Sequence, residues 1–129
     1  MLSLNTNAIK TYQQIDNTII PGREIEARVL NKAALKLKKC RDNWSASDTK
    51  DKLDEALKYN QRVWSIFQEE LSIDNNPLPQ KLKKDILALS IFIDKRIFDV
   101  MAYPSPEKLN IIIAINQNIA AGLKNSPIN

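Results

Sequence analysis

The sequence predicts an all-α protein, a small bundle of four to five helices around a central apolar helix at about residues 80–101. Apolar residues recur at steps of three and four along most of the chain, which is the spacing of one helix face. The two glycines, Gly22 and Gly122, are too few for the tight turns of an all-β fold. A chain of 129 residues with 43% hydrophobic content suits one domain. We expect a single helical domain over 1–129, with a loose tail at 124–129.

The first two expected helices differ in strength. Residues 5–17 place Ala8, Tyr12 and Ile15 on one side, but their polar content makes this helix marginal on its own. A second helix begins near Pro21 or Gly22, after a break in the pattern. The buried row of the second helix is expected to be Ala27, Leu30, Ala34 and Leu37.

A third helix is expected after the loop at 42–47, which contains Trp44. Ser47 or Asp48 is a suitable N-cap, and the helix runs to about Leu71. Its apolar positions step by four and three like the seam of a coiled coil. That seam comprises Leu53, Leu57, Asn60, Trp64, Phe67 and Leu71.

The stretch at 80–101 carries two apolar rows, which indicates a helix contacted from more than one side. The first row is Leu82, Ile86, Leu89, Ile93, Ile97 and Val100. The second row is Leu87, Ile91, Phe98 and Met101, with Ser90 and Asp94 between the two. About 22 residues give a helix about 33 Å long. The uncharged run at 86–93 is much shorter than the roughly 20 residues that cross a bilayer, so no membrane association is expected.

A last helix is expected after Tyr103 and Pro104, which end the preceding one. Ser105 is a suitable N-cap and Pro106 suits the first helical position. The apolar residues of this helix are Leu109, Ile112, Ile113, Ile119, Ala120 and Leu123.

Three polar residues occupy positions in these rows where an apolar residue is expected: Asn60, Ser90 and Asn116. A buried amide without a partner costs about 1–3 kcal/mol, so each needs a hydrogen bond, from another of the three or from a loop carbonyl. We favour a structural, register-fixing role in the core, with a partner-binding role as the alternative. We expect Asn60 to be more than about three-quarters buried. Trp64 is also expected in the core.

The residues that carry most enzyme chemistry are absent. The chain has no histidine, the commonest general base and metal ligand, and its one cysteine, Cys40, excludes a thiolate zinc site and an intrachain disulfide. We interpret Cys40 as a small buried hydrophobe, with a reactive thiol as the alternative. The carboxylates of Asp48, Asp51, Asp54 and Glu55 stand at a helix start and suit its dipole. We expect no catalytic, cofactor-binding or metal-binding residue, and therefore no enzyme.

Two surfaces are candidates for binding. Trp44, Ile66 and Phe92 are apolar side chains off the main rows, and together they are expected to form a partner-binding patch. The second candidate is basic and comprises Lys36, Lys38, Lys39 and Arg41 at the end of the second helix. We interpret this cluster as a solvated helix end, with phosphate or nucleic-acid contact as the alternative. The net charge of +4 permits such contact without indicating it.

Four motifs in order resemble the flagellar biosynthesis regulator FlaF family. Residues 22–30 (GREIEARVL) resemble its Arg-Glu-x-Glu helix start, and residues 60–65 (NQRVWS) resemble its Asn-x-x-x-Trp segment. Leu78-Pro79 with 86–93 is similar to its Leu-Pro followed by an apolar, serine-containing helix, and 115–123 (INQNIAAGL) matches its closing motif. The resemblance runs from about Ala8 to Leu123. Residues 92–96 depart from it, where the family often has a tryptophan and a Ser-Arg-His run, and no Ser-Pro precedes Gly22.

The resemblance implies a cytoplasmic regulator that promotes flagellin production or secretion, by chaperone-like binding to flagellin and in interplay with a second regulator, FlbT. Because the terminal segments of flagellin are amphipathic helices, recognition of a helix in a groove is the expected form. The N-terminus has no basic region followed by an apolar stretch, so no signal peptide is expected, in keeping with a cytoplasmic location. The alternative function is an RNA-binding helical module that acts on flagellin message through Lys36, Lys38, Lys39 and Arg41. Further candidate contacts of that module are Lys81, Lys83 and Lys84.

Overall fold

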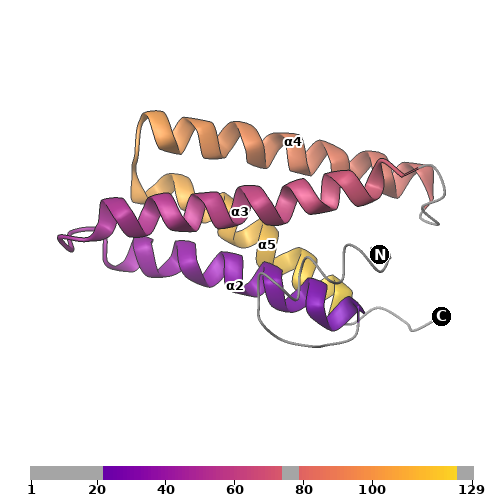
Figure 1. The fold of residues 1–129 in the computed structure, drawn as a ribbon, viewed down its shortest axis with the longest axis horizontal. Helices are drawn as coiled ribbons and strands as arrows, with labels where there is room; N and C mark the ends of the chain where they lie inside the picture. The colour runs from indigo at the N-terminus through magenta and orange to yellow at the C-terminus, as the bar shows by residue number, and fades with distance from the viewer. Residues whose placement is uncertain (1–21, 74–78, 125–129) are drawn as a thin grey trace.

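The computed structural model describes residues 22–73 and 79–124, all of whose regular elements are helical (Figure 1). The elements are α2 (Gly22–Asp42), α3 (Thr49–Leu71), α4 (Gln80–Ala102), the 3₁₀ turn η1 (Pro106–Lys108) and α5 (Leu109–Lys124). The predicted all-α class is therefore confirmed, and these helices begin and end within a few residues of the predicted bounds. The helix expected over 5–17 and the tail after 124 lie outside the described residues.

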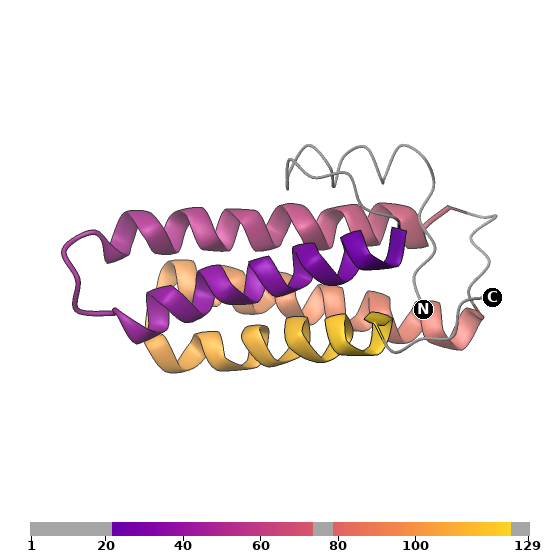
Figure 2. The same cartoon turned by 90° about the horizontal axis from the view of Figure 1, so that it is seen from below.

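The four helices form a bundle in which consecutive helices run in opposite directions (Figures 1 and 2). α2 packs against both α5 and α3, and α3 in turn packs against α4. α4 and α5 follow each other in the chain, yet they contact each other only slightly. The bundle therefore has three well-packed seams and one loose seam, between α4 and α5.

The expectation of a central helix at 80–101 is wrong. α4 packs mainly against α3, whereas α2 has extensive contacts on two sides. The reason lies in the second apolar row of α4, because Ile91, Phe98 and Met101 are exposed. Only one of the two rows is covered, so α4 is an outer wall of the bundle.

The helix ends follow the predicted positions with little help from side-chain caps. Asp48 stands at the N-cap of α3, but its side chain makes no capping hydrogen bond. Ser105 precedes η1 in an extended conformation and likewise makes no side-chain cap, with Pro106 following in the first turn. Because proline has a fixed φ and lacks an N–H, it suits this first position. The last helix therefore starts as a 3₁₀ turn that continues into α5.

The core is built from the inner rows of all four helices. Leu30 and Leu37 of α2, Trp64 of α3 and Ile112 of α5 are fully buried, and Trp64 and Phe67 pack edge to face at 5.6 Å. From α4 the core receives a single row, which comprises Ile86, Ser90, Ile93, Ile97 and Val100. Leu89 of the predicted first row is only partly buried.

Candidate functional site: the outer face of α4

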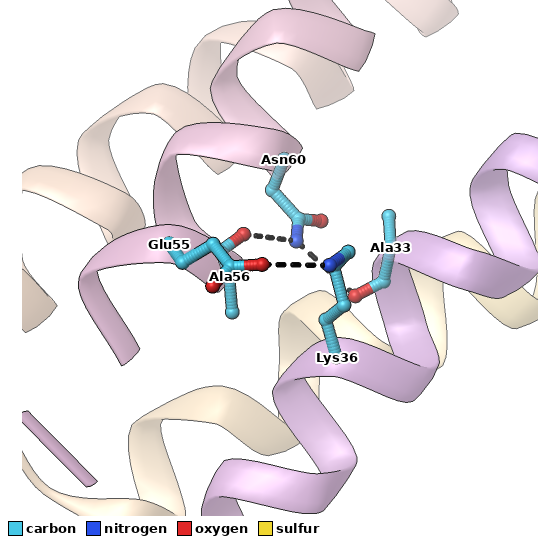
Figure 3. Close-up of polar contacts among 5 residues, drawn as sticks. All are labelled: Ala33, Lys36, Glu55, Ala56 and Asn60. Atoms are coloured by element: carbon cyan, nitrogen blue, oxygen red, sulfur yellow. Dashed lines mark hydrogen bonds and ion pairs between the residues drawn. The ribbon is translucent and has the colours of Figure 1, made fainter. Parts of the chain in front are cut away.

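The two buried asparagines meet each other in the middle of the bundle. Asn116 of α5 donates from Nδ2 to Oδ1 of Asn60 of α3 at 2.7 Å, and both residues are fully buried. The Nδ2 of Asn60 donates to the backbone carbonyls of Ala56, at 2.8 Å, and of Ala33 on α2, at 3.2 Å (Figure 3). This network joins three helices and confirms the predicted burial of Asn60. Of the two kinds of partner expected, another of the three polar residues or a loop carbonyl, the two asparagines have the first.

Trp64 completes this network. Its indole Nε1 donates to Oδ1 of Asn116 at 2.8 Å, and its ring is fully buried, as predicted. The amide oxygen of Asn116 thus accepts from Trp64 while its nitrogen donates to Asn60. Since buried polar groups without partners are costly, this arrangement lets three polar side chains stabilise the core rather than weaken it.

Ser90 does not belong to the network. It is fully buried on α4, but its hydroxyl donates to the carbonyl of Leu87 in its own helix at 2.7 Å. The two asparagines therefore face α2 and each other, and neither of their amides forms a hydrogen bond with a described residue of α4. Because the serine hydroxyl forms its hydrogen bond within its own helix, it does not connect α4 to a neighbouring helix.

The predicted partner-binding residues Trp44, Ile66 and Phe92 do not gather in one exposed patch. Trp44, in the α2–α3 loop, and Ile66, on α3, are both partly buried against the core. Ile66 lies 17 residues after the start of α3, which is about 25 Å of helix. Phe92 on α4 is exposed, and the guanidinium of Arg96 lies over its ring at 5.6 Å. Of the three, Phe92 alone presents a large apolar surface to solvent.

The main exposed apolar surface of α4 is a row that we call the α4 stripe, made of Leu87, Ile91, Phe98 and Met101. Ile91 is 54% and Phe98 65% exposed, and Met101 is also exposed, whereas Leu87 is partly buried. The residues are spaced by four, seven and three positions, so they lie on one side of the helix. The stripe extends over 15 residues, so its two ends lie about 21 Å apart along the helix. Large exposed apolar side chains that share one side of a helix tend to mark a binding site.

One polar residue interrupts the α4 stripe. Asp94 lies between Ile91 and Phe98 at helical spacing, and its Oδ2 accepts a hydrogen bond from Nε2 of Gln68 on α3 at 2.9 Å. The bond places this carboxylate at the α3–α4 seam beside the stripe. Asp94 has no further hydrogen-bond or ion-pair partner within 22–73 and 79–124.

The loose seam between α4 and α5 has different chemistry. A groove of about 340 Å³ there is lined by Arg96, Glu107, Lys108, Asn110, Ile111 and Ala114. Lys108, at the end of η1, holds this turn against the end of α4, because its Nζ lies 3.0 Å from Oδ2 of Asp99 and donates to the carbonyl of Tyr103 at 2.7 Å. Four of the six lining residues are polar or charged, whereas the α4 stripe is a row of apolar side chains.

Two of the four predicted basic residues already have partners on the protein. Lys36 donates to Oε1 of Glu55 at 3.1 Å, and Arg41 contacts both Asp42 and Asn110 at 3.0 Å (Figure 3 shows the Lys36 pair). Lys38 and Lys39 remain exposed. These contacts leave fewer free cations for phosphate than the sequence suggests.

A cleft of about 390 Å³ lies where α2 ends and α3 begins, with Cys40 in its wall. Burial is the main cause that raises the pKa of the Cys40 thiol, followed by the nearby Glu55 carboxylate. Hydrogen bonding from Lys36 lowers the pKa of Glu55. Because Cys40 is buried and its thiol is held protonated, it has the properties of a packed side chain, as expected. The cleft mixes lysines with Asp48 and Glu55, so its charge is not of one sign.

Within the described ranges, no three His, Cys, Asp or Glu side chains are placed to hold a metal ion. In that same part of the chain, no helix is long and apolar enough to cross a membrane.

The two apolar rows of α4 predict contacts on more than one side, but the residues of the α4 stripe are exposed or only partly buried. One signal distinguishes this row from the inner one: a charged residue, Asp94, stands in the middle of it, whereas Ser90 is the one polar interruption of the inner row. A charge at a helix position is far more often exposed than a hydroxyl. The position of Asp94 is therefore the feature of the sequence that indicates that the α4 stripe faces solvent.

Residues 8–123 match the family described as Flagellar protein FlaF, which covers nearly the whole chain. No curated protein and no solved structure matches the chain.

Proposed function

Because the chain belongs to the FlaF family of flagellar proteins, we propose that it regulates flagellum biogenesis by binding flagellin in a chaperone-like manner, with no catalytic step. The observation that carries the proposal is the α4 stripe: a helix of a well-packed bundle leaves Ile91, Phe98 and Met101 exposed. Apolar side chains at helical spacing on a rigid scaffold suit a partner's amphipathic helix. A flagellin terminus provides such a helix.

The rest of the molecule supports a scaffold for binding. The buried hydrogen bonds of Asn60, Asn116 and Trp64 fix α2, α3 and α5 in register, so the wall formed by α3 and α4 rests on a rigid base. A preorganised surface loses less entropy when it binds than a flexible one. An FlbT-type regulator is proposed as a second partner, acting with or against this protein on the same flagellin. The proposed site of action is the cytoplasm, where flagellin awaits export.

The alternative proposal, contact with flagellin message through Lys36, Lys38, Lys39 and Arg41, has less support. Lys36 and Arg41 are engaged with side chains of the protein, and the neighbouring cleft includes Asp48 and Glu55. Carboxylates beside a phosphate site would repel its ligand.

The proposed function is tested by co-elution of the full-length protein with the flagellin of its host on a sizing column, at about 50 mM and about 500 mM salt. We expect one shared peak at both salt concentrations, because burial of apolar surface is not weakened by salt. Separate peaks at both concentrations would exclude flagellin as the partner.

The RNA alternative is tested in parallel with the double charge reversal Lys38→Glu and Lys39→Glu. Both lysines are exposed, so the fold should be retained. Phosphate contacts make affinity fall steeply with salt, and each lost contact reduces that slope. If flagellin message binds the wild type and the double variant equally, or binds neither, the RNA alternative is excluded.

A further inference from the structure

We propose that the α4 stripe docks a helix of defined chemistry: an amphipathic partner helix with a hydrogen-bond donor in the middle of its apolar face and acidic residues along one edge. That the partner is flagellin rests on the proposed function. The chemistry required of the docked helix is inferred from the residues of α4 alone.

The spacing of the stripe requires a helix rather than a strand or a loop. Leu87, Ile91, Phe98 and Met101 occupy alternating steps of four and three, with Asp94 in the remaining position. This is the repeat by which two helices pack side by side along a shared seam. The length of about 21 Å corresponds to about four turns of a partner.

Asp94 specifies the middle of the partner. Gln68 holds one carboxylate oxygen of Asp94, and the other oxygen has no partner among the described residues. An apolar residue docked over it would leave a carboxylate desolvated and only partly hydrogen-bonded, which is costly. A threonine, asparagine or lysine at that point of the partner would donate to it instead. A single polar position of this kind fixes the register of paired helices.

Lys84 and Lys95 specify one edge of the partner. Lys84 lies three residues before Leu87, and Lys95 lies four after Ile91 and three before Phe98, so both flank the same side of the stripe. Both are exposed, and neither forms an ion pair within 22–73 and 79–124. By contrast, Lys36, Lys58 and Lys108 are each paired with a carboxylate. A partner with Glu or Asp along this edge is therefore complementary in charge.

A second copy of this chain does not meet these requirements. In a pair of copies, the Asp94 of one copy would face an apolar residue or the Asp94 of the other. The lysines at the edge of one stripe would meet the lysines of the other. Like charges placed together in an interface oppose association. The chemistry therefore points to a different protein.

The test uses two synthetic helical peptides of about 21 residues, six turns long. Both have leucines at four-three spacing and a central threonine, and they differ in having glutamates or lysines along one edge. Binding to the full-length protein is measured by fluorescence anisotropy at about 50 mM salt, where charge effects are least screened. We expect the glutamate-edged peptide to bind about tenfold more tightly, since complementary edges set specificity.

Charge reversal provides the decisive comparison. With Lys84→Glu and Lys95→Glu together, we expect the preference to invert in favour of the lysine-edged peptide. Misfolding would weaken the binding of both peptides, so it cannot invert the preference between them. An unchanged preference in this double variant would overturn the proposal.

Apolar truncation tests the stripe itself. The double variant Ile91→Ser with Phe98→Ser should weaken the binding of both peptides by about tenfold or more, as expected for the centre of an interface. The matched control is Leu35→Ser on α2, where a leucine is 49% exposed outside the stripe, and it should leave binding unchanged. Equal losses in control and stripe variants would overturn the proposal, as would self-association of the wild type that Phe98→Ser abolishes.

Flagellin then separates the two proposals. If flagellin co-elutes with the wild type but not with the stripe variants, both stand. If it co-elutes equally with all variants, the docking proposal fails and the proposed function stands. If it never co-elutes while the peptides show the inverted preference, the docking proposal stands and flagellin is not the partner.

Discussion

The inner network around Asn60 and the outer stripe around Asp94 begin from the same sequence pattern and end in opposite environments. Each is an apolar row at helical spacing that one polar residue interrupts. The inner row is covered by neighbouring helices, and its amide finds partners on α2 and α5. The outer row is left open, and its carboxylate finds one partner on α3.

The difference shows what decides whether a polar interruption belongs to the core. An asparagine carries both donors and acceptors, so two asparagines and a tryptophan satisfy one another without charge. A carboxylate accepts only and loses hydration when buried, so a single amide donor does not compensate for it. The polar groups of the inner row therefore satisfy one another, whereas the carboxylate of the outer row still needs a hydrogen-bond donor from a partner.

The largest expected effect on stability comes from removing one residue of the hydrogen-bond network of Asn60, Asn116 and Trp64. Asn116→Ala removes the acceptor of Trp64 and the donor to Asn60, which leaves two buried groups unsatisfied. At about 1–3 kcal/mol for each group, we expect unfolding to become easier by about 4 kcal/mol, measured in urea. In a double-mutant cycle, adding Asn60→Ala should cost less than in the wild type, because its partner is already lost. A loss below about 1 kcal/mol would show that the network is not needed for stability.

The next effect contrasts two isoleucines two residues apart on α4. Ile93 is fully buried and Ile91 is 54% exposed. Ile93→Ala leaves a cavity and should reduce the free energy of unfolding by about 3 kcal/mol. Ile91→Ala should change it by less than about 0.5 kcal/mol, because exposed positions contribute little. Similar losses at both sites, measured by the same urea titration, would mean that the outer row is covered in solution.

A smaller effect is expected where Gln68 holds Asp94. Gln68→Ala removes a partly buried hydrogen bond to a carboxylate and should lower stability by about 1 kcal/mol. The matched control is Gln61→Ala, a partly buried glutamine on the same helix whose side chain has no hydrogen bond among those found in the described residues. Thermal unfolding that shows no difference between the two variants would contradict a structural role for the bond.

The smallest effect concerns Glu55, far from either row. The ammonium of Lys36, 3.1 Å away, holds the pKa of the Glu55 carboxyl below its ordinary value. A folded-state pKa below that of the unfolded chain contributes stability above the unfolded pKa, and this contribution is lost as the pH falls through the folded one. Carboxyl-carbon NMR should show this lowered midpoint, and Lys36→Ala should move it upward. The same midpoint in both proteins would disprove the pairing in solution.

Much of the inner region was predictable, because residue type and spacing predict the burial of Trp64 and Asn60 and the need of each buried amide for a hydrogen-bond partner. The outer region was not. Periodicity identifies which residues share a helix face, but it does not reveal whether a neighbour covers that face. The row of Ile91 and Phe98 therefore looks like a second buried row although it is exposed, and the predicted patch of Trp44, Ile66 and Phe92 combines one exposed residue with two that are partly buried against the core.

The sequence by itself determined the helical class, the helix bounds between Gly22 and Lys124, and the polar residues that must find partners in the core. These properties depend on local spacing, proline and glycine positions, and the cost of burying an amide. The tertiary structure alone decided that α4 is an outer wall and that one of its two apolar rows faces solvent. That outcome depends on which helices lie side by side, a property of the whole packing that no single helix encodes.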